Sequence, residues 1–213
     1  QNRGLPDASL IRTISGMGAG LPHALLCRRP AFVVQAKPSL EQKRGGEMAL
    51  SEQYLEDEIH PIDIVENLAA YHEWDFDRIS EEQIAMAVEG QWRTYSLTLA
   101  WSAFDETLRL ICTFEMEPPE EKLPGLFELL NAVNDQCWAG AFTYWAEQKL
   151  MVYRYGLVLA GGHTASADQI DTMIGAAVMS AERYYPALQL LIWGDKTPHE
   201  ALQVAIAEAY GRA

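Results

Sequence analysis

Hydrophobic and polar positions alternate along two neighbouring stretches, and this predicts a β-hairpin at the centre of the fold. Large apolar side chains take every second position over residues 92–101 and again over 107–116. A period of two in segments rich in aromatic and β-branched residues indicates paired strands. Residues 102–106 between them are short and polar, as a hairpin loop requires. Each large inward side chain contributes about 1.5–3 kcal/mol when buried, so we expect this hairpin to supply much of the core.

Further strands are predicted on both sides of this hairpin. Residues 74–79 alternate like a short strand. Residues 84–89 suit a second strand, although the preceding Ser-Glu-Glu-Gln resembles a helix cap and leaves a helix open. Residues 141–146 and 150–159 form a second predicted hairpin. Since hairpins join antiparallel neighbours, we expect a mostly antiparallel sheet of about five to six strands.

Apolar positions at helical spacing predict four helices. The first begins at Pro61 and the second after Pro124. A long helix follows the capping box of Ser166 and Gln169, and a last one follows Thr197. Pro186 should kink or stop the long helix, so residues 187–193 are either its buried continuation or a short strand. Helices stacked on one face of the sheet define a two-layer α+β fold.

Composition restricts the classes of partner. The chain has 213 residues, 49% of them hydrophobic, and a formal net charge of -14. Phosphate binding needs clustered Lys and Arg, so nucleic acids and anionic membranes are excluded as main partners. A run of about 18 apolar residues is needed to span a bilayer, and the sequence has none, so we expect no membrane insertion. The acidic surface favours basic protein partners.

The N-terminal part differs from the rest. Residues 1–47 carry seven basic and three acidic residues, the first residue is Gln, and Met48 opens an ordinary-looking protein start. We interpret 1–47 as a disordered or mis-annotated extension, with a cleaved targeting segment as the alternative. Residues 48–59 are expected to be an acidic lead-in, and residues 60–213 the folded domain.

The sequence offers no pattern typical of catalysis, metal binding or cofactor binding. The five histidines are scattered without zinc-ligand spacing, and the serines lack a nucleophile elbow. Cys112 and Cys137 lie on apolar faces, as small hydrophobic residues do in a reducing cytoplasm. We therefore expect no catalytic residues, no metal, no cofactor and a cytoplasmic protein.

One set of charged residues lies within apolar elements. Arg154 is in a predicted strand, and Glu182 and Arg183 come late in the long helix. We interpret them as a buried polar cluster, an internal ion pair that fixes the helix on the sheet. The alternative is a ligand-facing cluster, or an enzyme that uses Glu182, Arg154 and a tyrosine as acid–base groups.

Aromatic residues are the other candidate signal. Seven of them on the predicted strands are candidates for a groove or interface that holds a peptide or a second subunit: Trp92, Tyr95, Trp101, Tyr144, Trp145, Tyr153 and Tyr155. A second layer of the domain's own core is an equally good interpretation.

Four runs together carry a family resemblance: VEGQWRTYSLTLAW, LLNAVNDQCWAGAFTYW, MVYRYGLVLAGG and AERYYPALQLLIWG. They are similar to the YbjN domain family, in its alphaproteobacterial branch, over residues 60–213. The resemblance implies a fold like that of type III secretion chaperones, which often dimerise and bind protein segments, and a regulator of sensory transduction. Some members carry a diacylglyceryl transferase label. That enzyme is an integral membrane protein, and this sequence offers no span.

These observations predict a non-enzymatic protein-binding or regulatory module of chaperone-like fold. It would hold a segment of a partner protein on an apolar surface, by strand addition or by a helix in a groove, and would form a homodimer. The sequence does not identify the partner. A small-molecule-sensing domain and an uncharacterised enzyme are the alternatives.

Overall fold

A six-stranded antiparallel sheet forms one layer of the domain, as the alternating pattern predicts. The computed structural model describes residues 59–211. The predicted extension 1–47 lies outside them, as does the lead-in 48–59 except for its last residue. The sheet has the order β1-β2-β3-β4-β6-β5. Its strands are β1 Asp75–Ser80, β2 Gln83–Glu89, β3 Thr94–Ser102, β4 Thr107–Glu115, β5 Ala141–Trp145 and β6 Leu150–Val158.

The register between strands collects the large apolar side chains on one face. Leu97 of β3 pairs with Cys112 of β4, which pairs with Tyr153 of β6. Because strand side chains alternate between faces, the positions two residues away on each strand share this face. Leu97, Cys112 and Tyr153 are all buried. The central hairpin thus supplies core, as predicted.

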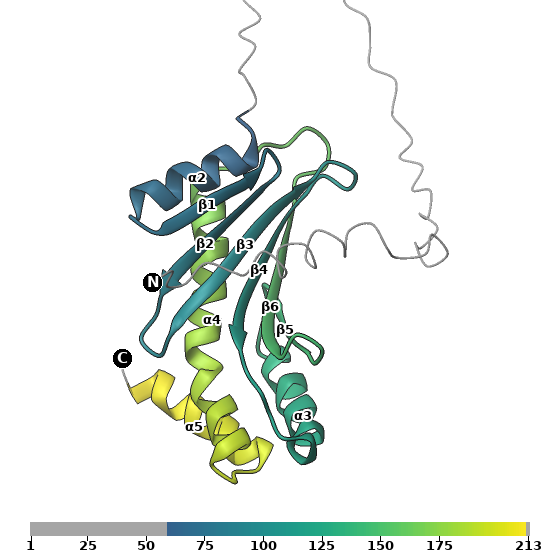
Figure 1. Cartoon of the computed structure of the whole chain (residues 1–213), viewed down its shortest axis with the longest axis vertical. Coiled ribbons are helices and arrows are strands. Elements are labelled where there is room, and N and C mark those ends of the chain that lie inside the picture. Colours follow the sequence, from purple (N-terminus) through teal and green to yellow (C-terminus); the bar gives the residue numbers. More distant parts are fainter. Residues whose placement is uncertain (1–58, 212–213) are drawn as a thin grey trace, which may run out of the picture. The chain divides into compact units, whose positions relative to one another are not determined.

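Helices cover this apolar face. They are α2 Pro61–Tyr71, α3 Leu123–Asn134, α4 Ala167–Trp193 and α5 Pro198–Gly211, with a short 3-10 turn η1 Glu120–Lys122 before α3. Figure 1 shows α4 running along the whole length of the sheet behind the strands. It packs on β4 and β6, while α2 packs on β2 and β3, and α5 packs on α4. The two-layer α+β architecture is confirmed.

The structure settles two points that the sequence left open, the path of the chain after Pro186 and the conformation of residues 84–89. Pro186 lies inside α4, which continues to Trp193, so a stop at Pro186 is wrong and residues 187–193 are helix rather than strand. Pro186 has no N–H to donate to the carbonyl of Glu182, which costs stability. Leu188 and Ile192 are buried beyond it, and this burial offsets the cost. The open choice at residues 84–89 is also settled, since they lie in β2.

The outer edge of β5 is closed by a side chain from α3. The Asn134 amide nitrogen donates to the carbonyl of Phe142 at 3.0 Å, and the Phe142 N–H donates to Asn134 Oδ1 at 2.7 Å. An edge strand otherwise presents unpaired backbone groups to other chains. Asn134 therefore occupies the backbone groups that an added strand would need at Phe142.

Replacing Asn134 should loosen this edge. Asn134→Ala removes two hydrogen bonds from a partly buried backbone position, and we expect the free energy of unfolding to fall by about 1–3 kcal/mol. Urea denaturation measures the change. Asn131→Ala, at an exposed position on the same helix, is the matched control and should stay within about 0.5 kcal/mol of the wild type. Equal losses in both variants would contradict the role given to Asn134.

Candidate functional site

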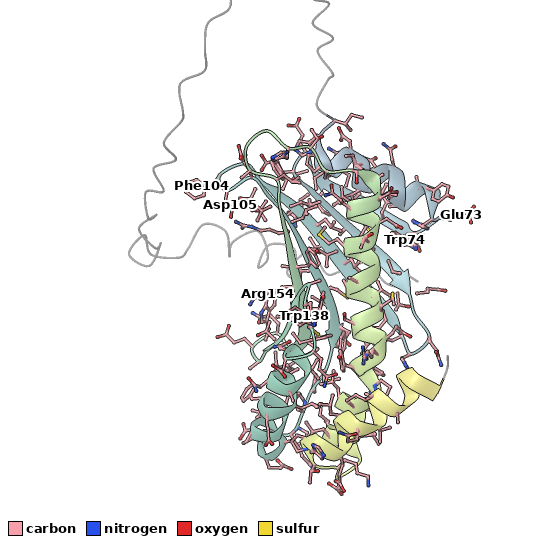
Figure 2. All side chains as sticks on the ribbon, turned by 180° about the vertical axis from the view of Figure 1, so that it is seen from behind. Glu73, Trp74, Phe104, Asp105, Trp138 and Arg154 are labelled. Atoms are coloured by element: carbon pink, nitrogen blue, oxygen red, sulfur yellow. The ribbon has the colours of Figure 1, made fainter. Side chains whose placement is uncertain are left out.

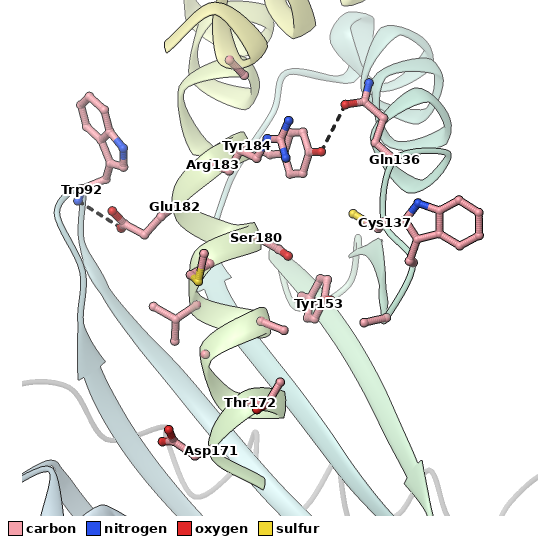
Figure 3. Close-up of a pocket in the computed structure, with 17 residues that line it drawn as sticks. Trp92, Gln136, Cys137, Tyr153, Asp171, Thr172, Ser180, Glu182, Arg183 and Tyr184 are labelled. Atoms are coloured by element: carbon pink, nitrogen blue, oxygen red, sulfur yellow. Dashed lines mark hydrogen bonds between the residues drawn. The ribbon is translucent and has the colours of Figure 1, made fainter. Parts of the chain in front are cut away.

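An open cleft of about 840 Å³ runs across the outward face of α4. Figure 3 shows Trp92 beside Glu182 on one flank of the helix, and Cys137 and Tyr153 on the other. The cleft is lined mainly from α4, and further residues come from the β2–β3 turn, from the segment between α3 and β5, from β6 and from α5. It is therefore built by segments that are distant in the sequence.

The floor of the cleft is apolar and exposed. Gly175 and Ala176 are partly exposed, and Met179 is 72% exposed. A Cβ built on Gly175 meets no atom within 4 Å. Trp138 at one lip is 99% exposed and Trp92 at the other is 42% exposed. Large aromatic and thioether side chains left in water around an open helix face are typical of an interaction surface.

Glu182 ties α4 to the turn between β2 and β3. Its carboxylate accepts hydrogen bonds from Tyr95 Oη at 2.7 Å, from the Gln91 N–H at 2.9 Å and from the Trp92 N–H at 3.2 Å. Gly90 makes room for it, because a Cβ there would overlap Glu182 Oε1. The carboxylate thus joins the helix to the sheet through a tyrosine and backbone amides, and not through the ion pair with an arginine that the sequence predicted.

The Tyr95 hydroxyl is held in its neutral form. Burial is the main cause that raises the pKa of Tyr95 above its ordinary value of 10.0, and the hydrogen bond to Glu182 is the next. Tyr95 is fully buried. A tyrosine that resists ionisation and donates its proton to a carboxylate serves packing and hydrogen bonding rather than acid–base chemistry at neutral pH.

The predicted buried cluster of Arg154, Glu182 and Arg183 is not assembled. Arg154 and Arg183 are both exposed. Arg154 follows the buried Tyr153 in β6, so strand alternation turns it to the opposite face of the sheet. Figure 2 shows Arg154 projecting away from the sheet on the side remote from α4. Arg183 lies in the cleft, with its guanidinium 5.3 Å from the ring centroid of Tyr184.

The seven aromatic residues predicted as a groove separate into three environments. Tyr95 and Tyr153 are buried in the core. Trp101, Tyr144 and Tyr155 are partly buried and pack against that core, so for these five the alternative, core interpretation describes their positions. Trp145 is half-buried on the other face of the sheet. Of the seven, only Trp92 and Tyr153 line the cleft.

Sequence reasoning missed Trp138 and Met179. Trp138 lies in a loop, where no periodicity marks its exposure. Met179 lies outside the apolar stripe that predicts the long helix, so the helical pattern drew no attention to it. The spacing of Gly175 and Met179 could have identified this surface. The two residues are four positions apart, so they lie on the same ridge of the helix.

The cysteines and His72 are further residues with reactive or metal-binding side chains. Burial raises the pKa of the Cys112 thiol to about 12, and burial also raises the pKa of Cys137. Neither thiol is activated as a nucleophile. His72 is exposed, and its Nε2 contacts Asp171 Oδ1 at 2.9 Å. Within residues 59–211, no three His, Cys, Asp or Glu side chains are grouped so as to hold a metal ion.

Fold and site together define an α+β domain with an exposed apolar cleft across α4. The profile of the YbjN family, described as "Putative bacterial sensory transduction regulator", matches residues 61–190. The chain therefore belongs to the YbjN family, as its sequence resemblance indicated.

A YbjN protein and a chaperone–effector complex are among the solved structures that are similar to this chain. The crystal structure of YbjN from E. coli is 11% identical, covers 58% of this chain and 90% of that one, and gives a TM-score of 0.43. The HopA1–SchA chaperone–effector complex is 14% identical, with coverage of 57% and 89% and a TM-score of 0.40. No curated protein sequence matches the chain significantly. Over the described residues, every helix lacks the length or the apolar character needed to cross a bilayer.

Removing the Glu182 tether should destabilise the domain. Glu182→Ala leaves the buried Tyr95 hydroxyl without its acceptor, and we expect unfolding to become easier by about 2–3 kcal/mol. Tyr95→Phe removes the donor as well, so the double variant should lose less than the sum of the single losses. Chemical denaturation of the four proteins measures this coupling. Glu128→Ala, on the exposed face of α3, is the control. Additive losses would contradict the tether.

Buried tyrosines should make the fold sensitive to alkali. Burial raises the pKa values of Tyr95, Tyr153 and Tyr184 in the folded chain. Below about pH 10 these tyrosines are protonated in both the folded and the unfolded chain, so they add no pH dependence to the free energy of unfolding there. Above it only the unfolded chain loses protons, so stability falls by up to about 1.4 kcal/mol per pH unit for each tyrosine. Urea midpoints from pH 8 to 11.5 test this, and Tyr95→Phe should show a shallower fall. Identical slopes would refute the contribution of Tyr95.

Proposed function

We propose that the chain is a non-enzymatic regulatory module that binds a protein segment in the cleft across α4. The observation that carries this proposal is the exposed apolar floor at Gly175 and Met179, bordered by Trp92 and Trp138. Interfaces between proteins are enriched in Trp and Met relative to the rest of the surface. The family description of a sensory transduction regulator is consistent with such a role.

The openness of the cleft favours a polypeptide over a small molecule. Small-ligand pockets bury about 70–90% of the ligand surface. Here Trp138 is 99% exposed and Met179 is 72% exposed. The enzyme alternative loses its acid–base set, because Arg154 lies on the face of the sheet opposite to α4, and the Tyr95 hydroxyl keeps its proton and donates a hydrogen bond to the Glu182 carboxylate. A segment lying along the surface of the cleft is the better occupant.

A helix in the groove is favoured over an added strand. Asn134 occupies the backbone groups of Phe142 on the β5 edge, and this opposes strand addition there. The open space over Gly175 lets another backbone approach α4 closely. Apolar anchors at helical spacing suit such a groove. The partner segment is therefore expected to be an amphipathic helix.

The charge around the cleft has both signs. Asp171 and Arg183 both line it, whereas residues 59–211 as a whole carry 8 Lys and Arg against 23 Asp and Glu. The acidic remainder keeps the surface well hydrated while the cleft stays apolar. We place the protein in the cytoplasm and expect its partners to include a second copy of the chain.

A matched pair of exposed apolar positions tests the proposal. Met179→Glu places a charge in the cleft, and Phe127→Glu places one on α3, where the native side chain is 53% exposed. Affinity purification of both variants and the wild type from the native host should recover a partner with the wild type and Phe127→Glu. With Met179→Glu its recovery should fall by at least about tenfold. Equal recovery with both variants would overturn the cleft as the binding surface.

A further inference from the structure

We infer that the α4 cleft seats the same α4 ridge of a second copy of this chain, in a two-fold symmetric dimer. The inference rests on the proposed function and names one partner for the same site. It is carried by four exposed or partly exposed residues of α4 at four-residue intervals: Asp171, Gly175, Met179 and Arg183. We call this row the α4 ridge.

The α4 ridge follows the natural ridge direction of an α-helix. Side chains at i and i+4 lie in rows inclined about 26° to the helix axis. When two helices interdigitate such rows they cross at about −50°, the commonest class of helix packing. Two copies of the α4 ridge can therefore run alongside each other in opposite directions, related by a two-fold axis.

The register of that pairing is self-complementary. An axis passing through the level of Ala177, midway along the ridge, sets Gly175 opposite Met179 of the second copy and Asp171 opposite Arg183. The large side chain then fills the space over the residue without a Cβ, and opposite charges meet at both ends. Because the interface is isologous, every contact occurs twice.

Gly175 supports this assignment independently. A glycine in a helix interior costs about 0.5–1 kcal/mol relative to alanine. Nothing in the described part of the chain approaches the position, since a Cβ there would meet open space. The fold of one copy therefore gains nothing from this glycine, whereas close approach of a second α4 does.

The charged ends are available for the pairing. Arg183 is exposed and takes part in none of the salt bridges formed within residues 59–211. Asp171 is about half exposed and contacts His72 through Oδ1, and none of the other salt bridges within residues 59–211 involves its carboxylate. Repulsion between two acidic domains is screened beyond about 8 Å at physiological ionic strength, so the charges at the interface dominate.

A charge exchange tests the register. Sedimentation velocity of the full chain at 1–100 µM and about 150 mM salt should give a dimer, twice the 23.8 kDa chain mass. Asp171→Arg and Arg183→Asp should each weaken dimerisation by about tenfold or more, because each substitution sets like charges together at both ends. The double variant Asp171→Arg/Arg183→Asp should regain the wild-type dissociation constant. His72→Ala, which removes only the intrachain contact of Asp171, should leave it unchanged.

Two outcomes would overturn the inference: a monomer throughout the concentration range, or a dimer that both single reversals leave intact. Circular dichroism melting of each variant verifies folding, and all the substituted positions are exposed or half-exposed. Loss of partner recovery with Met179→Glu in a monomeric protein would leave the proposed function standing and remove only the second copy as occupant. If Met179→Glu and Phe127→Glu recover the partner equally well and the dimer through the α4 ridge is confirmed, the cleft binds a second copy of the chain and no other partner.

Discussion

The contact on which this structure depends is the Glu182 carboxylate bound to the Tyr95 hydroxyl and to two amides of the β2–β3 turn. It joins the middle of a long helix to the far end of the central strands, in a space that Gly90 leaves open. Charge-assisted hydrogen bonds of this kind fix geometry as well as adding stability. With α4 held at this rotation, its apolar stripe faces the sheet and the α4 ridge faces outward. The position of the cleft follows from that one attachment.

The repetitive parts of the fold could be predicted from the sequence, since alternation and helical spacing are local signals. The β3–β4 hairpin, the capping box at Ser166 and the antiparallel sheet all follow from them. Continuation of α4 past Pro186 could not be predicted, because buried leucine and isoleucine side chains beyond it decide the outcome through tertiary packing.

The site was harder to predict because its contacts join residues about 90 positions apart. Glu182 was interpreted as part of an internal ion pair between helix and sheet, whereas it accepts hydrogen bonds from Tyr95 and from backbone amides of a distant turn. No sequence pattern identifies those partners. The face of the sheet on which Arg154 lies could have been predicted from the sequence. Strand alternation puts it on the face opposite Tyr153, so it could never meet a helix that covers Tyr153. Exposed Trp138 lacked any periodic signal.

The account holds that the α4 ridge is a contact surface, with Gly175 of one copy against Met179 of another. Cysteine cross-linking measures this most directly, in full chains whose Cys27 and Cys137 are replaced by serine. Mild oxidation of a mixture of Gly175→Cys and Met179→Cys chains should give a disulfide-linked dimer that joins one chain of each kind, since disulfides need Cα atoms about 4.4–6.8 Å apart. Each variant alone should give little. Absence of the mixed dimer, or equal cross-linking of the single variants, would contradict the account.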